Sequence, residues 1–202
     1  MQAWTLAHIF LYLGCDKRPR LSLIKQYKMK LTASTNDTYF VTMTVINWVD
    51  VFTRPVYKDL LIENLEYCRK EKGLEIYSYV IMTNHVHMIA KGKDKPLGDI
   101  LRDFKTFTSK ELFRAIKDNA KESRGDWMIS LMNKAGKKNI LNVNHQFWEN
   151  YNQPIIINDN RTFLIKQNYI HQNPVRAGFV VNDYDYLYSS ACELSPLIVD
   201  EY

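Results

Sequence analysis

The sequence predicts an α+β protein with a ferredoxin-like split βαβ fold, in which an antiparallel sheet has helices on one face and an open second face. Strand-like segments rich in β-branched and aromatic residues alternate with amphipathic helical segments, in the order strand, helix, strand, strand, helix, strand. An additional C-terminal helix follows the last strand. With 46% hydrophobic and 13% aromatic residues, the 202-residue chain has enough apolar material for one packed domain.

The first half of the chain supplies three of the predicted strands. Residues 39–46 (YFVTMTVI) have the composition of a half-buried strand. Residues 54–72 place apolar side chains at helical spacing, and Gly73 stands where a helix C-cap belongs. Residues 74–81 and 85–91 then predict a hairpin of two strands separated by a short polar break.

The second half supplies the remaining helices and the last strand. Pro96 can open a helix with one apolar side and a basic opposite arc. A short strand within residues 154–157 precedes a helix that Asn158 or Asp159 caps and that Pro174 stops. The apolar side of the earlier helix consists of Leu97, Ile100, Leu101, Phe104, Phe107 and Leu112.

The ends of the chain and one internal segment lack these patterns. The apolar run 3–14 is too short to span a bilayer, and basic residues follow it instead of preceding it, so we expect neither secretion nor membrane insertion. We predict that residues 1–30 are an unpacked extension, 31–195 the domain and 196–202 a tail. Residues 119–144 have little periodicity and predict a mobile insertion without regular structure.

The basic excess belongs to the middle of the chain. The net charge is +5, and residues 91–138 carry 13 Lys or Arg and 7 Asp or Glu, which leaves 14 against 15 elsewhere. Such a patch attracts phosphate backbones, although a solvated mixed-charge helix is the commoner explanation of a single charge run. The three cysteines are far apart and lack zinc or disulfide spacing, which favours a reduced, cytoplasmic protein.

Two histidines on one predicted strand suggest a metal site. His85 and His87 are separated by one residue, so both imidazoles leave the same face while Val86 and Met88 enter the core. This arrangement is half of a metal site, and a third ligand must come from another element. Without such a partner, an isolated His-x-His segment is more often an ordinary pair of sheet histidines.

The last predicted helix carries a candidate nucleophile. Tyr169 and Asn173 are four residues apart, which places a phenol and an amide on the same side of a helix. A phenol can attack a phosphodiester to form a covalent intermediate, and Asn173 could supply the missing oxygen ligand. In a chain with 13 tyrosines, packing is the commoner role of any one of them.

Together these segments resemble the REP-associated tyrosine transposases of the HUH superfamily of single-strand endonucleases and transposases. Two separated motifs in the right order, with a matching fold prediction, are more specific than either motif alone. The resemblance spans roughly residues 35–190 and is carried by residues 79–89 (YVIMTNHVHMI), 147–148, 151–156 and 169–180 (YIHQNPVRAGFV).

The resemblance implies a mechanism. His85 and His87 match the metal-binding pair, for Mg or Mn, and Tyr169 matches the single nucleophilic tyrosine. Family members cleave single-stranded DNA beside a hairpin, leave a 5′-phosphotyrosine and a free 3′-hydroxyl, and can reseal the strand without a nucleotide cofactor. Asn173 stands where related transposases have a glutamine ligand, so its coordination is tentative, and His171 points to another side of a regular helix.

Partners follow from the same resemblance: single-stranded DNA with hairpins or palindromic repeats, bound by a monomer or homodimer. Thr83 replaces the usual proline before the Asn-His pair, for which we expect only a local hairpin effect. Trp148 and Tyr151 could stack on bases, but aromatic residues beside a strand are more often core. The candidate phosphate contacts are Arg102, Lys105, Lys91, Lys93 and Lys95.

Two rival functions remain open. The same fold could bind single-stranded nucleic acid without cutting it. Alternatively, His85 and His87 could serve a metal-dependent phosphoesterase that uses water as the nucleophile. Covalent capture of DNA by Tyr169 would distinguish the transposase from both rivals.

Overall fold

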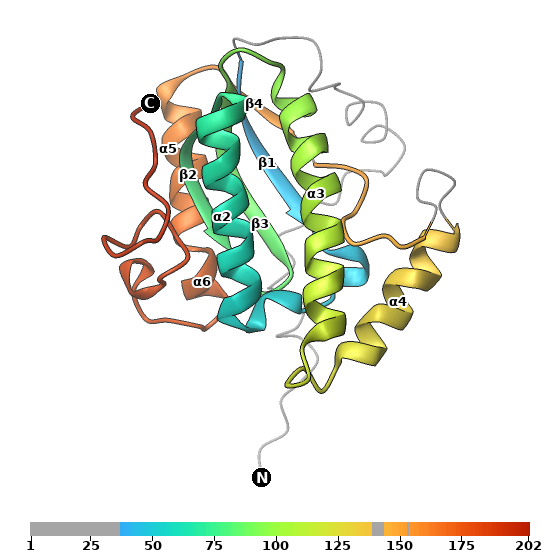
Figure 1. Ribbon diagram of the computed structural model, residues 1–202. Coiled ribbons are helices and arrows are strands. Elements are labelled where there is room, and N and C mark those ends of the chain that lie inside the picture. Colours follow the sequence, from blue (N-terminus) through green and yellow to red (C-terminus); the bar gives the residue numbers. More distant parts are fainter. Residues whose placement is uncertain (1–36, 139–143, 153) are drawn as a thin grey trace, which may run out of the picture.

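A four-stranded antiparallel sheet forms the centre of the domain (Figure 1). The computed structural model describes residues 37–138, 144–152 and 154–202, so the predicted N-terminal extension lies outside the described residues. The strand order β2-β3-β1-β4 is that of the predicted split βαβ fold, which confirms the fold class. The strands are β1 (Thr38–Thr44), β2 (Leu74–Ile81), β3 (His85–Gly92) and β4 (Ile155–Ile157).

Helices lie on both sides of this sheet. Helices α2 and α3 lie side by side over one face, and α4 packs against α3 (Figure 1). The helices are α2 (Pro55–Lys72), α3 (Leu97–Asp118), α4 (Gly125–Lys138), α5 (Asn160–His171) and α6 (Asn173–Arg176). Single 3-10 turns occur at Ile46–Trp48, Val51–Thr53 and Asp183–Asp185.

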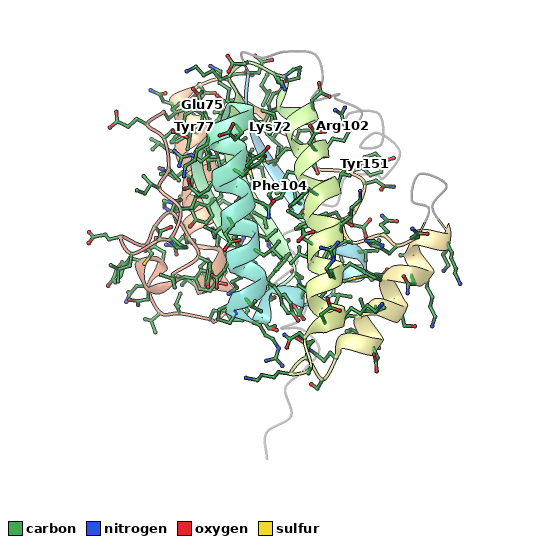
Figure 2. The ribbon with its side chains drawn as sticks, viewed as in Figure 1. Lys72, Glu75, Tyr77, Arg102, Phe104 and Tyr151 are labelled. Carbon is green, nitrogen blue, oxygen red and sulfur yellow. The ribbon has the colours of Figure 1, made fainter. Side chains whose placement is uncertain are left out.

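The main core lies between the sheet and helices α2 and α3. Val86 and Met88 point into it from β3, as the alternation of the strand predicts. Figure 2 shows Phe104 between α2 and α3, where its side chain is buried. Phe107 is 55% exposed, so its predicted place on the apolar side of α3 is wrong, and Thr108 is buried on that side instead.

The second face of the sheet is covered in part by α5. Phe163 and Ile170 of α5 pack with Phe40 and Ile89 of the sheet in a smaller apolar cluster. The expectation of an open second face is therefore wrong where α5 lies. Because the odd-numbered residues of β3 also point to this face, α5 is brought against the predicted histidine pair.

The ends of the helices match their sequence signals. Gly73 adopts a left-handed conformation (φ 69°) as the C-cap of α2, which glycine does without steric cost. Asp159 caps α5 by accepting a hydrogen bond from the Thr162 amide at 2.8 Å. The helix ends at His171, two residues earlier than predicted, and Pro174 lies in the separate short helix α6.

Residues 119–144 were predicted to lack regular structure, and this is wrong for residues 125–138, which form α4. Met128 and Met132 are fully buried against α3. The sequence does contain a helical signal here, because Met128, Leu131, Met132 and Ala135 recur at helical spacing. A Cβ atom at Gly136 would lie 2.6 Å from the His145 Cα, so only glycine allows this close approach.

The C-terminal residues are part of the fold. Backbone hydrogen bonds join this segment to β2, from the Ile81 amide to Tyr188 and from the Asp200 amide to Ile76. Tyr202 stacks on Phe163 with ring centroids 4.0 Å apart. The outer edge of β2 is therefore occupied by the chain's own C-terminal segment. In the described part of the chain, no helix is long and apolar enough to cross a membrane.

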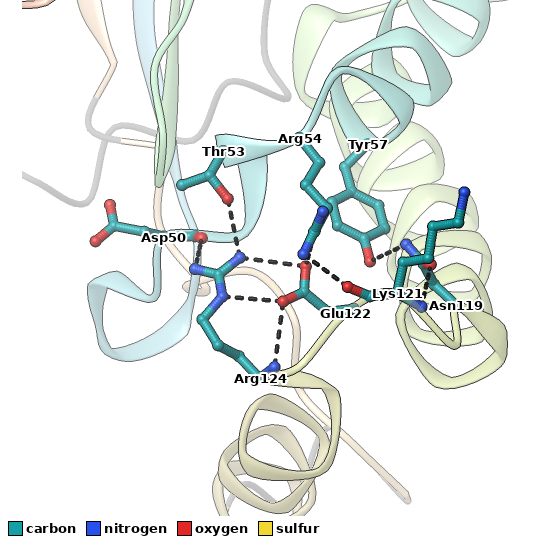
Figure 3. A network of polar contacts seen from close by, with 8 residues as sticks. All are labelled: Asp50, Thr53, Arg54, Tyr57, Asn119, Lys121, Glu122 and Arg124. Carbon is teal, nitrogen blue, oxygen red and sulfur yellow. Dashed lines mark hydrogen bonds and ion pairs between the residues drawn. The ribbon is translucent and has the colours of Figure 1, made fainter.

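A buried carboxylate ties the start of α4 to the start of α2 (Figure 3). The Glu122 side chain has no exposed surface and accepts hydrogen bonds from Arg54 Nε at 2.7 Å and Arg124 Nε at 3.0 Å. Arg124 also donates to the Asp50 carbonyl and to Thr53 Oγ1, both at 2.9 Å. Hydrogen bonds from Arg124 and then Arg54 lower the pKa of Glu122 to about 2.

We predict that Glu122→Gln lowers the free energy of unfolding by about 2–4 kcal/mol at pH 7, because two guanidinium groups lose their charged partner. The folded-state pKa lies below the unfolded one, so this stabilisation is complete above about pH 4.5 and lost as the pH falls through about 2. Urea unfolding of the wild type and the variant at several pH values measures this pH dependence of stability. Glu111→Gln, which breaks an exposed pair with Arg114, should change stability by less than about 1 kcal/mol.

Candidate active site

The predicted histidine pair lies on the face of the sheet that α5 covers. In the register of β3 with β1, His85 is opposite Thr44 and His87 is opposite Thr42. The two imidazole centroids are 4.6 Å apart. His87 is buried beneath α5, and His85 is partly exposed at the start of the strand.

Hydrogen bonds fix the orientation of both rings. His85 Nδ1 is 2.7 Å from Asn84 Oδ1, while Asn84 Nδ2 donates to Asp50 Oδ1 at 2.9 Å. Since the amide nitrogen of Asn84 is committed to Asp50, its oxygen must face His85 and accept the Nδ1 proton. Neutral His85 therefore has its lone pair on Nε2. His87 Nδ1 is 2.8 Å from Thr42 Oγ1, which also leaves Nε2 directed away from the strand pair.

Both histidines are neutral at physiological pH. Burial lowers the pKa of His85 to about 4, and a hydrogen bond with the Asn173 side chain offsets this only in part. Burial, followed by the nearby charges of His85 and Lys166, holds the pKa of His87 well below 6.5. Neutral imidazoles can coordinate a cation without first losing a proton.

Tyr169 is brought to this pair by α5. Its ring centroid is 5.2 Å from that of His87, with the rings at 69° to each other. Phe40 of β1 contacts the same tyrosine edge to face at 5.9 Å. The neighbouring Ile170 is fully buried and anchors the helix, while Tyr169 is 37% exposed. The phenol is thus held at the surface beside the histidines.

Asn173 lies near the histidines at the start of α6, directly after α5. Gln172 lies between the two helices, and the Asn173 side chain is close enough to His85 to raise the pKa of that imidazole. His171 points elsewhere, because its Nε2 lies 2.9 Å from Ser190 Oγ and 3.2 Å from Ser78 Oγ. The amide of Asn173, not the imidazole of His171, is therefore the neighbour of the pair.

These contacts define the residues that could hold a metal ion. No group of three or more His, Cys, Asp or Glu with metal-binding geometry occurs among the residues that the structure describes. A site built on His85 and His87 would therefore take a neutral oxygen ligand, and Asn173 Oδ1 is the one nearby. Thr83, in place of the expected proline, hydrogen-bonds to Asp50 at 2.6 Å, and the pairing of β2 with β3 is regular next to it, from Ser78 to Ile81.

Two cations lie on the adjoining rings of Phe40 and Tyr169, and neither was predicted from the sequence. Lys166 Nζ lies 5.0 Å from the Phe40 ring centroid, and the Arg176 guanidinium lies 5.1 Å from the Tyr169 ring centroid. The spacing of Lys166 and Tyr169, three residues apart on one helix, was a signal that could have found Lys166. Arg176 follows the helix break, so no regular spacing leads to it.

The predicted phosphate contacts lie outside this cluster. Arg102 is exposed on α3 and pairs with Asp99 and Asp103 (Figure 2). Lys105 donates to the Glu149 carbonyl and to Asn152 Oδ1, and burial lowers its pKa to about 8. Its ammonium is thus engaged in holding the loop before β4.

The three lysines at the end of β3 are also distant from the histidines. A strand rises about 3.3 Å per residue, so the six residue steps from His85 to Lys91 correspond to about 20 Å. Lys93 and Lys95 are exposed in the loop that follows. A role of these lysines in contacting flanking DNA stays a prediction.

The two aromatic residues considered for base stacking differ in burial. Trp148 is 4% exposed and donates from Nε1 to Thr108 Oγ1 at 3.0 Å, so it belongs to the core. Tyr151 is 74% exposed and lies beside α3 in Figure 2.

We predict an acid-dependent loss of stability from the histidine pair in the metal-free protein. The unfolded chain protonates His85 below about pH 6.5, but the folded protein does so only below about 4, so stability falls over this interval. At pH 5 the free energy of unfolding is lower by about 2 kcal/mol because of this residue. Urea unfolding with a chelator at pH 7.5 and pH 5 should show a smaller loss in His85→Gln. An equal loss in wild type and variant would contradict the assigned burial.

Comparisons with known proteins bear on the fold and on the first part of the domain. A sequence search of curated proteins gave no match. The family model "Transposase IS200 like" matches residues 33–130, a span that contains the histidine pair and ends before Tyr169. A solved REP-associated tyrosine transposase bound to a REP hairpin has a similar structure, with a TM-score of 0.55, 17% identity and 78% of each chain covered. The family resemblance is therefore confirmed: this chain is similar to the IS200-like transposases over residues 33–130 and shares the fold of a REP-associated tyrosine transposase.

Proposed function

We propose that this protein is a metal-dependent enzyme that cleaves and rejoins single-stranded DNA beside a hairpin through a 5′-phosphotyrosine intermediate. The observation that carries the proposal is the convergence of Tyr169 on His85 and His87, with ring centroids of Tyr169 and His87 5.2 Å apart. The IS200-like transposase match supports DNA cleavage and transfer as the class of activity. The tyrosine chemistry and the metal are our inference from the site.

The residues present fit a bound Mg²⁺ or Mn²⁺. His85 and His87 would hold it through Nε2, and Asn173 through its side-chain oxygen. Such an ion would polarise the scissile phosphate and stabilise the charge that develops on it. The hydrogen bonds from Asn84 and Thr42 would keep both imidazoles oriented for this role.

Tyr169 would act as the nucleophile. Its phenolic oxygen, after losing its proton, attacks the phosphorus and forms the O–P bond of a phosphotyrosine. The bond from phosphorus to the 3′-oxygen breaks, and this oxygen leaves as a hydroxyl after taking up a proton. The phosphotyrosine is itself a phosphodiester, so the number of such linkages does not change. A 3′-hydroxyl can therefore attack it later and reseal the strand without a nucleotide cofactor.

The cations around the phenol support attack on a phosphate. Arg176 lies over the Tyr169 ring and Lys166 lies over the neighbouring Phe40 ring, and their charges would hold an anionic phosphodiester near the phenol. Burial lowers the pKa of Lys166. We assign these residues the positioning of the scissile phosphate, and we retain Arg102, Lys105, Lys91, Lys93 and Lys95 as candidate contacts to flanking DNA.

The partner we propose is single-stranded DNA that carries a hairpin or palindromic repeat. The solved REP-associated transposase is bound to a REP hairpin, and the shared fold supports a similar substrate here. A monomer is favoured over a homodimer formed through β2, because the C-terminal segment already occupies the edge of that strand. The proposal includes a cytoplasmic, nucleoid-associated location.

We predict that Tyr169→Phe abolishes covalent capture of DNA but leaves DNA binding unchanged, because only the nucleophilic oxygen is removed. Hairpin-bearing single strands are labelled at the 3′ end, incubated with protein and Mn²⁺, and separated on a denaturing gel. The wild-type protein should carry the 3′ label as a retarded covalent species. Tyr67→Phe, at an exposed tyrosine on α2, is the matched control and should behave as wild type.

The same gel distinguishes the rival functions. Cleavage that continues in Tyr169→Phe, with no retarded species in the wild type, would establish a phosphoesterase that uses water. Binding without cleavage, with Mg²⁺ or Mn²⁺ present, would establish a binding module. Either result would refute the proposed nucleophile.

A further prediction concerns Asn173 as the third ligand. Asn173→Ala should weaken Mn²⁺ binding at least about tenfold, whereas Asn173→Asp should strengthen it because a carboxylate adds a charged oxygen. Isothermal titration calorimetry measures both affinities. Asn168→Ala, at an exposed position on α5, is the matched control. Unchanged affinity in both Asn173 variants would exclude this residue from the site.

A further inference from the structure

The turn that follows β1 has an unusual backbone. Asn47 (φ 55°) and Trp48 (φ 56°) are the described non-glycine residues with positive φ. Asparagine tolerates this left-handed region, but a bulky aromatic residue there is a true outlier. Such conformations persist when the surrounding structure holds them, and they cluster at ligand-binding sites. The conformation of Trp48 thus requires an explanation.

The strained turn presents the Trp48 indole to solvent beside the histidine pair. The side chain is 59% exposed, and its ring centroid is 5.8 Å from that of His85. Asn84 Nδ2 donates to the Trp48 carbonyl at 3.3 Å and so holds the turn in place. Burial of the indole therefore does not explain the strain, since the ring is displayed at the edge of the candidate site.

A basic groove begins at the same turn. Asn47 lines a surface groove of about 650 Å³ between this turn and α4. Lys134 and Lys138 of α4 contribute two positive charges to its lining, and Glu149 contributes one negative charge. A polyanion that crosses the histidine pair could therefore continue past Trp48 into a groove of net positive charge.

We propose that Trp48 stacks on an unpaired base of the DNA strand next to the cleaved phosphate, and that the groove between the turn and α4 holds the adjoining backbone. This inference rests on the proposed function and names a further binding site for its substrate. We infer single-stranded DNA as the occupant because it is the substrate of the proposed function and supplies both a flat base for an exposed indole and phosphates for the lysines. Stacking on an aromatic side chain tolerates any base. This site therefore adds affinity and fixes the position of the strand without specifying its sequence.

The test compares two probes that differ only in their bases. One is fluorescein-labelled oligothymidylate, and the other is an abasic strand of the same length and charge. Binding is measured by fluorescence anisotropy at low salt with a chelator, in the Tyr169→Phe background, so that neither cleavage nor metal contributes. Trp48→Ala should weaken oligothymidylate binding about 5- to 150-fold and leave abasic binding almost unchanged. Trp48→Phe should retain most of the affinity.

Two control variants separate the base contact from general effects. Trp127 on α4 has a similar exposure of 53%, and Trp127→Ala should leave both affinities unchanged. Lys134→Ala should weaken both probes equally and reduce the salt dependence of binding, because it removes a phosphate contact. Trp48→Gly should match Trp48→Ala in binding while unfolding at the same or a higher urea concentration, since glycine adopts positive φ without strain.

The outcomes distinguish this inference from the proposed function. If Trp48→Ala binds both probes as the parent does, or weakens both equally, the base-stacking role is refuted. Covalent capture of hairpin strands by the Tyr169-intact protein would still stand in that case. If the parent protein binds neither probe and no variant captures DNA, both the inference and the proposed function fail.

Discussion

The candidate site depends on the packing of α5 against the second face of the sheet. Phe163 and Ile170 bury their side chains against Phe40 and Ile89, and this contact brings a tyrosine from far along the chain to within 5.2 Å of His87. The alternation of side chains along β3 places both histidines on this face, because a shift of one residue in the register would turn both imidazoles into the main core. One apolar contact and one strand register therefore place all the groups that the proposed chemistry uses.

The electrostatics of the site follow from where these groups are buried. Burial disfavours the protonated form of both imidazoles, and for His87 the nearby His85 and Lys166 add to this, so the pKa of each lies below its ordinary value. The fixed positive charge near the phenol comes instead from Lys166 and Arg176. A site with neutral side chains at its centre and cations at its rim favours an anionic phosphodiester. A cluster of carboxylates in the same place would repel the negative charge of the phosphodiester.

Much of this arrangement could be predicted from the sequence, and the failures have physical causes. The alternation around His85 and His87 and the strong strand patterns are local signals, so the sheet was predicted correctly. Helix α4 was not predicted although Met128, Leu131, Met132 and Ala135 recur at helical spacing, because many polar residues surround this short stripe. The four-residue spacing predicted Tyr169 and Asn173 on one side, and the structure brings both to the histidines although α5 ends at His171.

The conformation of the turn after β1 could not be predicted from the sequence either, since positive φ at Trp48 is set by tertiary contacts and not by its residue type. Those contacts link the two proposed sites. The Asn84 side chain accepts from His85 Nδ1 through its oxygen and donates to the Trp48 carbonyl and Asp50 through its nitrogen. An amide that does both cannot rotate for one partner without releasing the other. The orientation of the His85 imidazole and the display of the indole are therefore coupled by one side chain, so a base seated on Trp48 would stabilise the same Asn84 conformation that directs His85 Nε2 toward the proposed metal ion.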